Sequence, residues 1–153
     1  MTPTDAELRA LDAVIDRAVQ RHADEGGGIL FTAAVVMDGE TLALCDNESA
    51  QDCDASRHAE IVAMARAQQA LGRTDLSGAT LIASMQPCEM CLSAMRWAGI
   101  DRLVFAMTQE RAPAFFQFPQ LSIDDFARAA DDGFDWSGGH GADRVAHIYE
   151  DGA

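Results

Sequence analysis

The fold is decided between residues 79 and 107, which read ATLIASMQPCEMCLSAMRWAGIDRLVFAM. The stretch opens with an apolar segment that alternates around Leu81 and Ile82, which is typical of a strand. Pro87 stands where a helix can begin, and Gly99 stands where one can end. A second apolar strand occupies the last six residues of the stretch. A strand, a helix and a strand of these lengths indicate a parallel crossover, and so an α/β fold.

Other elements lie on both sides of this unit. Thr4 and Glu7 have the spacing of a capping box, which marks the start of a helix. Asp38-Gly39 is a strong hairpin turn between two apolar runs. The sequence therefore predicts helices over residues 4–24, 58–71, 88–98 and 122–130, strands over 29–37, 41–45, 79–85 and 102–107, and a last strand or short helix over 144–149. Loops are expected over 46–57, 108–121 and 131–141.

The composition fits one folded domain over residues 1–153. The hydrophobic fraction of 48% is too high for a disordered chain, and no apolar run approaches the roughly 20 residues of a membrane span. The first residues have neither the basic start nor the apolar core of a signal peptide, so we expect a cytoplasmic protein without membrane contact. The formal net charge is −14, and the chain has no lysine. Since so acidic a surface repels a phosphate backbone, a nucleic-acid partner is disfavoured.

Two short motifs carry the reactive side chains, a His-Ala-Glu sequence and a Pro-Cys-Glu-Met-Cys sequence. They supply three metal ligands, His58, Cys88 and Cys91, and the carboxylate of Glu60, which has no evident ligand role. A histidine and two thiolates suit zinc better than calcium or magnesium. Three protein ligands leave a tetrahedral zinc one position short, and an open position is typical of a catalytic site. A structural zinc site would need a fourth ligand, for which Cys53 is the candidate, and a redox pair of cysteines is the other alternative.

Helix geometry is expected to bring these motifs together. Cys88 and Cys91 are three residues apart, so they share one face in the first turn of their helix. The unpaired N–H groups and the helix dipole favour thiolates there. His58 also starts a helix, so the two helix N-termini can meet over the ends of the central strands. Further along the second helix, Met95 and Trp97 are expected to face the core.

On these residues the chain resembles the cytidine-deaminase-like superfamily, and within it the branch that holds guanine deaminases and tRNA adenosine deaminases. The resemblance runs from about residue 29 to 106 and rests on the hairpin, the two motifs and the thirty-residue gap from His58 to Cys88. In that branch an asparagine eleven residues before the zinc histidine holds the substrate ring, and Asn47 stands at that position. By itself, Asn47 would be read as a turn former. The implied fold is a three-layer αβα sandwich around a mixed sheet.

The resemblance also implies a zinc-dependent hydrolytic deaminase, with one zinc ion per chain that carries a bound water. Glu60 would take a proton from that water and return it to the substrate. It would protonate the adjacent ring nitrogen and then, in a second proton transfer, the leaving amine, so that ammonia departs. Ala59, between two of these residues, is expected to contact the substrate. A homodimer is expected from the resemblance alone.

The expected substrate is a free nucleobase or a related small aminated heterocycle. Guanine is the leading candidate, followed by cytosine or a nucleoside. Deamination of adenosine in tRNA is the alternative enzyme function. A catalytically silent zinc module used for interaction is a third reading, in which Glu60 would have no chemical task.

The chain departs from the family pattern at positions outside the four chemical residues. Gln86 stands where glutamate is usual, and Arg57 where a small residue is frequent. A loop after the last central strand carries Phe115, Phe116 and Phe118 near the zinc end of the sheet. Because aromatic rings stack on heterocycles, Phe115 and Phe116 are candidates for a wall of the substrate pocket, with ordinary packing as the alternative.

Overall fold

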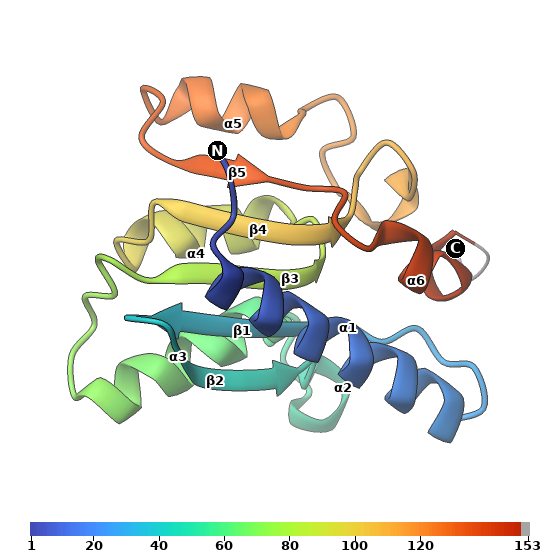
Figure 1. Ribbon diagram of the computed structural model, residues 1–153. Coiled ribbons are helices and arrows are strands. Elements are labelled where there is room, and N and C mark those ends of the chain that lie inside the picture. Colours follow the sequence, from blue (N-terminus) through green and yellow to red (C-terminus); the bar gives the residue numbers. More distant parts are fainter. Residues whose placement is uncertain (151–153) are drawn as a thin grey trace.

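The computed structural model describes residues 1–150, which form one mixed sheet with helices on both faces (Figure 1). Along the chain the elements are α1 (Asp5–Asp24), β1 (Thr32–Met37), β2 (Glu40–Asp46), α2 (Ser49–Asp52), α3 (Ala59–Leu71), β3 (Thr80–Met85), α4 (Glu89–Trp97), β4 (Arg102–Met107), the 3₁₀ helix η1 (Pro113–Phe115), α5 (Ile123–Ala129), β5 (Asp135–Ser137) and α6 (Ala142–Tyr149). The strands lie in the order β2-β1-β3-β4-β5. β1 runs antiparallel to β2 and β3, whereas β3, β4 and β5 are parallel. The predicted mixed sheet and the parallel crossover through α4 are therefore confirmed.

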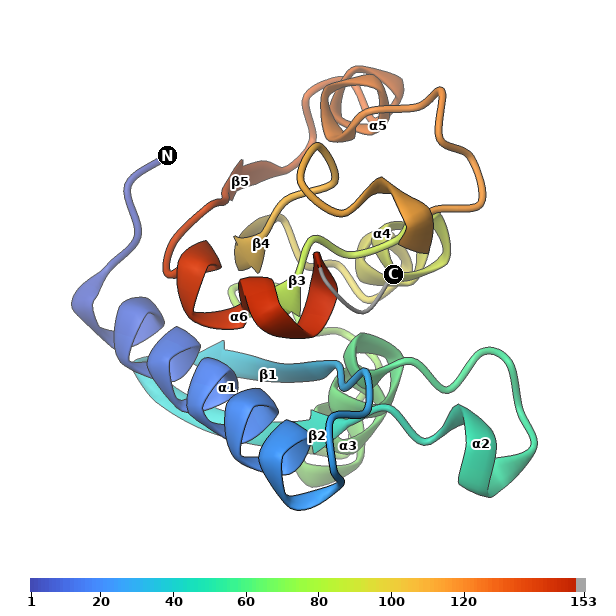
Figure 2. The ribbon, with the colours of Figure 1, turned by 90° about the vertical axis from the view of Figure 1, so that its right-hand side faces the viewer.

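The helices form a layer on either side of the sheet, as Figure 2 shows. α1 and α6 cover one face, where they pack on Val36, Ile82 and other strand residues. α3, α4 and α5 cover the opposite face, where a second core cluster includes Val35 and Leu81. Neighbouring strand residues thus point to opposite faces, and both faces are apolar. The expected α/β class and three-layer αβα sandwich are confirmed. Within residues 1–150, no helix combines the length and the apolar character that crossing a membrane requires.

Local signals set where several elements begin and end. The Thr4 side chain accepts a hydrogen bond from the Glu7 backbone N–H, and the Glu7 side chain accepts one from the Thr4 N–H. Asp38 and Gly39 have φ angles of 52° and 79°, the left-handed backbone that a tight hairpin between β1 and β2 requires. Gly72, with a φ of 68°, ends α3. Each of these boundaries was predictable because the residues that form it are neighbours in sequence.

The structure corrects several expectations. The three predicted loops contain short elements, α2, η1 and β5 respectively, and the segment 144–149, expected as a strand or a short helix, belongs to helix α6. β5 has only three residues, too few to display the period of a strand. Trp97 is 92% exposed, although Met95 is buried as expected. Two steps along a helix rotate the side chain by about 200°, so Met95 and Trp97 cannot both face the core.

Tyr149, at the end of α6, ties this helix to the sheet and to the chain before β1. Its hydroxyl lies 2.7 Å from Ser84 Oγ and donates a hydrogen bond to the Leu30 carbonyl oxygen at 2.5 Å. Its ring stacks on that of Phe31, with centroids 5.3 Å apart. Burial raises the pKa of the Tyr149 hydroxyl, which therefore stays a neutral donor.

We expect the Tyr149→Phe variant to lose about 1–3 kcal/mol of unfolding free energy, because buried partners of the hydroxyl are left without their hydrogen bond. Urea denaturation followed by circular dichroism measures the loss. The Ser84→Ala/Tyr149→Phe double variant is the control, since residues that share a bond should lose less together than the sum of the single losses. An unchanged unfolding midpoint in Tyr149→Phe would count against the bond.

Candidate zinc and active site

Two helix N-termini converge at one end of the sheet. His58 is the N-cap of α3 and Cys88 is the N-cap of α4, and both have extended backbone. Cys91 lies in the first turn of α4. The Nδ1 atom of His58 is 3.5 Å from Cys88 Sγ and 3.7 Å from Cys91 Sγ. The structure therefore brings together three side chains that are up to 33 residues apart in sequence.

The three donor atoms fit a zinc ion. They all lie within 4.8 Å of one another. Zn–N and Zn–S bonds of about 2.1 and 2.3 Å at a tetrahedral angle place the nitrogen and the sulfur about 3.6 Å apart, which agrees with both observed separations. Cys53, the candidate fourth ligand of a structural site, is exposed, and its Sγ is 3.9 Å from the carbonyl oxygen of Ala50. Within residues 1–150 the ligand group contains His58, Cys88 and Cys91 without Cys53, so one zinc position stays open to solvent or substrate.

Hydrogen bonds and burial set the protonation of the ligands. A hydrogen bond from Cys91 lowers the pKa of Cys88 to about 4, so Cys88 is a thiolate. The bond to Cys88 raises the pKa of His58, and the same thiolate together with burial raises the pKa of Cys91. Two thiolates at this distance repel each other, and a divalent cation between them offsets that repulsion. The chemistry of the donor set therefore favours a bound cation.

Glu60 lies beside the ligands without belonging to them. Its residue is 5% exposed, and its Oε2 accepts a hydrogen bond from Cys91 Sγ at 3.3 Å. Burial raises the pKa of its carboxyl group. A buried carboxyl group with a raised pKa can take up and release a proton near neutral pH.

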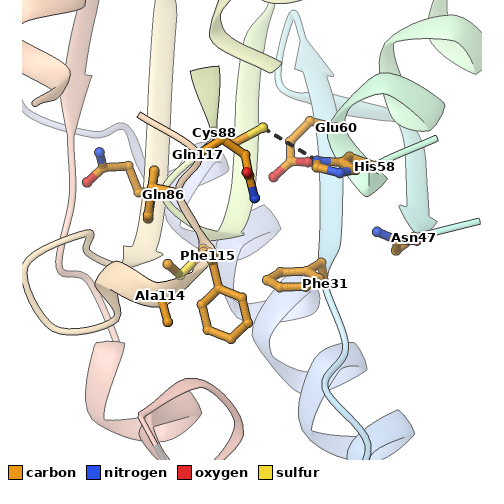
Figure 3. A pocket seen from close by; sticks show the side chains of 11 residues that line it. Phe31, Asn47, His58, Glu60, Gln86, Cys88, Ala114, Phe115 and Gln117 are labelled. Atoms are coloured by element: carbon orange, nitrogen blue, oxygen red, sulfur yellow. Dashed lines mark hydrogen bonds between the residues drawn. The ribbon is translucent and has the colours of Figure 1, made fainter. Parts of the chain in front are cut away.

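These side chains open onto a cavity of about 270 Å³, shown in Figure 3. His58, Glu60 and Cys88 line one part of it. The remaining lining residues are Phe31, Asn47, Met85, Gln86, Ala114, Phe115, Phe116 and Gln117. The lining combines aromatic rings with three side-chain amides, an arrangement that suits a flat heterocycle with polar edges.

The structure places the other predicted substrate residues in different surroundings. Asn47 lines the cavity, and its Oδ1 also accepts the Ser49 backbone N–H at 2.8 Å, so it forms a turn and keeps its NH₂ group for a ligand. Phe115 and Phe116 line the cavity as well. Ala59 is fully buried in the core below the site, and its side chain is not part of the lining.

Two departures from the family pattern have structural roles. Gln86 Oε1 accepts the backbone N–H of Gln109 at 3.0 Å, and Gln86 Nε2 is 3.3 Å from Gln109 Oε1. A glutamate at position 86 would set a second acceptor against Gln109 Oε1, so the glutamine matches its neighbour. Arg57 forms ion pairs with Glu48 at 3.3 Å and with Asp52 at 3.4 Å, which tie α2 to the start of α3.

Sequence reasoning missed four residues of the cavity wall, Phe31, Met85, Ala114 and Gln117. Phe31 and Met85 read as ordinary strand residues, and no local pattern reveals that they stand at the open end of the sheet. The sequence indicated only weakly that Gln117 lines the pocket, because it stands among three phenylalanines in the loop expected near the zinc. Its exposure in that loop follows from contacts that are remote in sequence.

Comparisons with known proteins agree with this geometry. Residues 8–107 match the family described as the cytidine and deoxycytidylate deaminase zinc-binding region. The chain is 34% identical over 94 residues to a tRNA-specific adenosine deaminase of Agrobacterium fabrum, covering 61% of this chain and 62% of that protein. It is 38% identical over 81 residues to a guanine deaminase of Bacillus subtilis, covering 53% and 52%. The chain thus spans less than two thirds of the length of these curated relatives.

A solved structure of a guanine deaminase from Nitrosomonas europaea has a TM-score of 0.78 and 25% identity with this chain, and covers 98% of this chain and 85% of its own. The likeness therefore extends past the two motifs into the segment after β4. The expected superfamily, and the branch with guanine and tRNA adenosine deaminases, are confirmed. Because the matched residues include all three zinc ligands and Glu60, the chain belongs to the cytidine and deoxycytidylate deaminase zinc-binding family.

Proposed function

We propose that this protein is a zinc-dependent hydrolase that deaminates a free nucleobase or a related small aminated heterocycle, with guanine as the leading substrate. The observation that carries the proposal is the position of Glu60, a buried carboxyl group that faces the cavity beside three zinc ligands. A structural zinc site needs neither a cavity nor such a carboxyl group.

A cytoplasmic setting is part of the proposal, and the four free cysteines support it.

The residues of the site have distinct tasks in this proposal. When bound by His58, Cys88 and Cys91, zinc supplies an acidified water as the nucleophile. Glu60 takes one proton from the nucleophilic water and gives it to the ring nitrogen, and it then transfers the second proton of that water, from the hydroxyl now bonded to the ring carbon, to the leaving amine. The ring C–NH₂ bond is replaced by C=O, one water is consumed, and ammonia is released.

The cavity wall would orient the ring. Asn47 donates its free NH₂ group to a ring acceptor, while Phe115 and Phe116 contact the apolar ring faces. Ala59 can contribute only through its backbone N–H, because its methyl group is buried in the core. These roles require a planar substrate with polar atoms on its edges.

Size and charge support a small molecule over a tRNA. The cavity of about 270 Å³ lies at the small end of ligand pockets. The net charge of −14 opposes contact with a phosphate backbone. Two of the relatives above are guanine deaminases, which favours guanine ahead of cytosine or a nucleoside. The alternative, deamination of adenosine in tRNA, is favoured by the Agrobacterium fabrum relative.

One assay separates these functions. Ammonia release is measured with guanine, cytosine, adenine, their nucleosides, and an adenosine-containing anticodon stem-loop. The proposal expects turnover of a free base, guanine above the others, and none of the stem-loop. Turnover of the stem-loop alone would replace our proposal with the tRNA function.

We further propose that the protein pairs as a homodimer through the outer surface of α3 and α4. An apolar groove on this surface is lined by Ile61, Met64, Ala65, Gln68, Thr74, Ala94, Trp97 and Ala98. In a chain with 25 acidic residues, these two helices carry acids only at Glu60 and Glu89, and both are buried. A protruding indole beside an apolar groove is self-complementary, as a twofold interface requires, and aromatic residues without acidic neighbours are typical of interface cores.

We expect the wild-type protein to have the mass of two chains in light scattering after gel filtration, and the Trp97→Ala variant to have the mass of one. Trp97 is 92% exposed, so its replacement removes an interface anchor without opening the core. Leu8→Ala is the matched control, because Leu8 is an exposed apolar residue of α1 on the opposite layer. A single-chain mass for the wild type would refute the dimer.

A further inference from the structure

The segment from Pro113 to Phe118 borders the cavity, and its residues 114–117 line it and contribute one polar side chain. In Figure 3 the Gln117 amide points toward Cys88 and Glu60, between the zinc ligands and the ring of Phe115. Gln117 is exposed, so its amide is free to meet a ligand from solvent. It belongs to the lining of the cavity without belonging to either motif.

The three side-chain amides of the cavity differ in the hydrogen bonds that they already form with the protein. Gln86 uses both ends of its amide on Gln109. Asn47 uses its oxygen on the Ser49 backbone. Among the hydrogen bonds of residues 1–150, none engages the Gln117 side chain, so both its donor and its acceptor remain open. Of the three, Gln117 alone has an amide that forms no hydrogen bond with the part of the protein that the structure describes, so its oxygen and its NH₂ group are both fully available for a paired contact with a ligand.

A buried carboxylate holds the backbone beside Gln117. Glu89 Oε1 accepts the backbone N–H of Phe118 at 2.7 Å, and Glu89 is 9% exposed. Glu89 directly follows Cys88, so the bond joins the segment to the same turn of α4 that carries two zinc ligands. A charged acceptor buried against one backbone N–H is a strong and directional contact.

We propose that Gln117 is a specificity-determining residue that reads the substrate edge, and that Glu89 is a positioning residue that holds Gln117 over the site. The substrate class that fits is a ring with an N–H next to a carbonyl, because a glutamine amide presents the complementary acceptor and donor side by side. Guanine and cytosine have such an edge, whereas adenine has no carbonyl. The inference rests on the proposed deaminase function and narrows its substrate.

The kinetic test compares guanine deamination by the wild type with that of four variants, Gln117→Ala, Glu89→Ala, Glu89→Gln and Gln117→Ala/Glu89→Ala. We expect Gln117→Ala to raise KM about 10- to 100-fold with a smaller change in kcat, since it loses paired hydrogen bonds made by ground state and transition state alike. Glu89→Ala should raise KM similarly. Glu89→Gln keeps an acceptor oxygen and should stay near wild type. The double variant should match Gln117→Ala, because a positioning residue has nothing left to position.

Metal analysis and a binding measurement make the outcomes distinct. All four variants should retain the zinc content of the wild type. Calorimetry measures the affinity for guanine in Glu60→Gln and in Glu60→Gln/Gln117→Ala, since the Glu60 replacement prevents turnover during the measurement. The affinity of the second protein should be about 10- to 100-fold lower than that of the first. An unchanged KM and affinity on loss of the Gln117 amide overturns the reading role. The positioning role of Glu89 is overturned if the increases in KM caused by Gln117→Ala and Glu89→Ala multiply in the double variant. It is also overturned if KM of Glu89→Gln is as high as that of Glu89→Ala. If the wild type deaminates none of the substrates but loss of the Gln117 amide still weakens guanine binding, the proposed function is refuted and the role of Gln117 in recognising the ring edge is retained.

Discussion

The Glu60→Gln variant is expected to release ammonia about 10²- to 10⁴-fold more slowly than the wild type while it keeps its zinc. Glutamine has the size of glutamate, and its NH₂ group can donate a hydrogen bond to the Cys91 thiolate, which lies 3.3 Å from the Glu60 carboxyl group, so the ligand set should keep its geometry. It cannot take a proton from the nucleophile or return one to the leaving amine. The loss should therefore fall on kcat, with little change in the affinity for the substrate. Steady-state ammonia release and zinc analysis of the same preparation provide both numbers.

Glu40→Gln is the matched control for this experiment. Glu40 is an exposed glutamate at the start of β2, so its replacement changes the charge by the same amount away from the site. It should leave both activity and zinc content unchanged. Full activity in Glu60→Gln would mean that the carboxyl group has no chemical task in the reaction. The assignment of Glu60 as the proton-transfer group would then be refuted.

Replacement of a zinc ligand should have the second large effect. His58→Ala and Cys88→Ala each leave two protein ligands, too few for a stable zinc site. We expect the zinc content to fall from about one per chain to less than about a tenth, and the melting temperature to fall with it, because binding free energy contributes to folding. Metal analysis of the purified variants and thermal denaturation measure these two effects.

Cys53→Ala separates a ligand from an ordinary cysteine. Cys53 is exposed and lies outside the ligand group, so this variant should keep a full zinc content. Loss of zinc in Cys53→Ala would revive a four-ligand structural site. Full zinc occupancy in both His58→Ala and Cys88→Ala would refute the ligand assignment.

The sequence predicted well the parts of the molecule that depend on neighbours in the chain. The capping box at Thr4, the Asp38-Gly39 hairpin and the stop at Gly72 are each formed by residues a few positions apart. The strand, helix and strand around Cys88 were readable for the same reason. Because two helices that begin with ligands must meet at the sheet, the zinc group could also be inferred.

Features that depend on distant contacts could not be predicted. The three residues of β5 form a strand only because β4 offers a free edge. Trp97 reads as a core residue until the orientation of α4 is known. Tyr149 meets Leu30 across 119 residues, and Glu89 meets Phe118 across 29. Such pairings are decided by the assembled fold, so no period or motif in the sequence reveals them.

The first turn of α4 positions two parts of the site, the zinc ligands and the loop at Phe118. On one side Cys88 and Cys91 belong to the zinc group, and on the other Glu89 holds the backbone at Phe118. Metal binding and the hydrogen bond to the Phe118 backbone therefore both stabilise the same helical turn. Sites that stabilise a common element are coupled reciprocally, so each favours the other by the same free energy. The zinc ion is thus expected to act on substrate affinity as a cooperative effector, in addition to its part in the reaction.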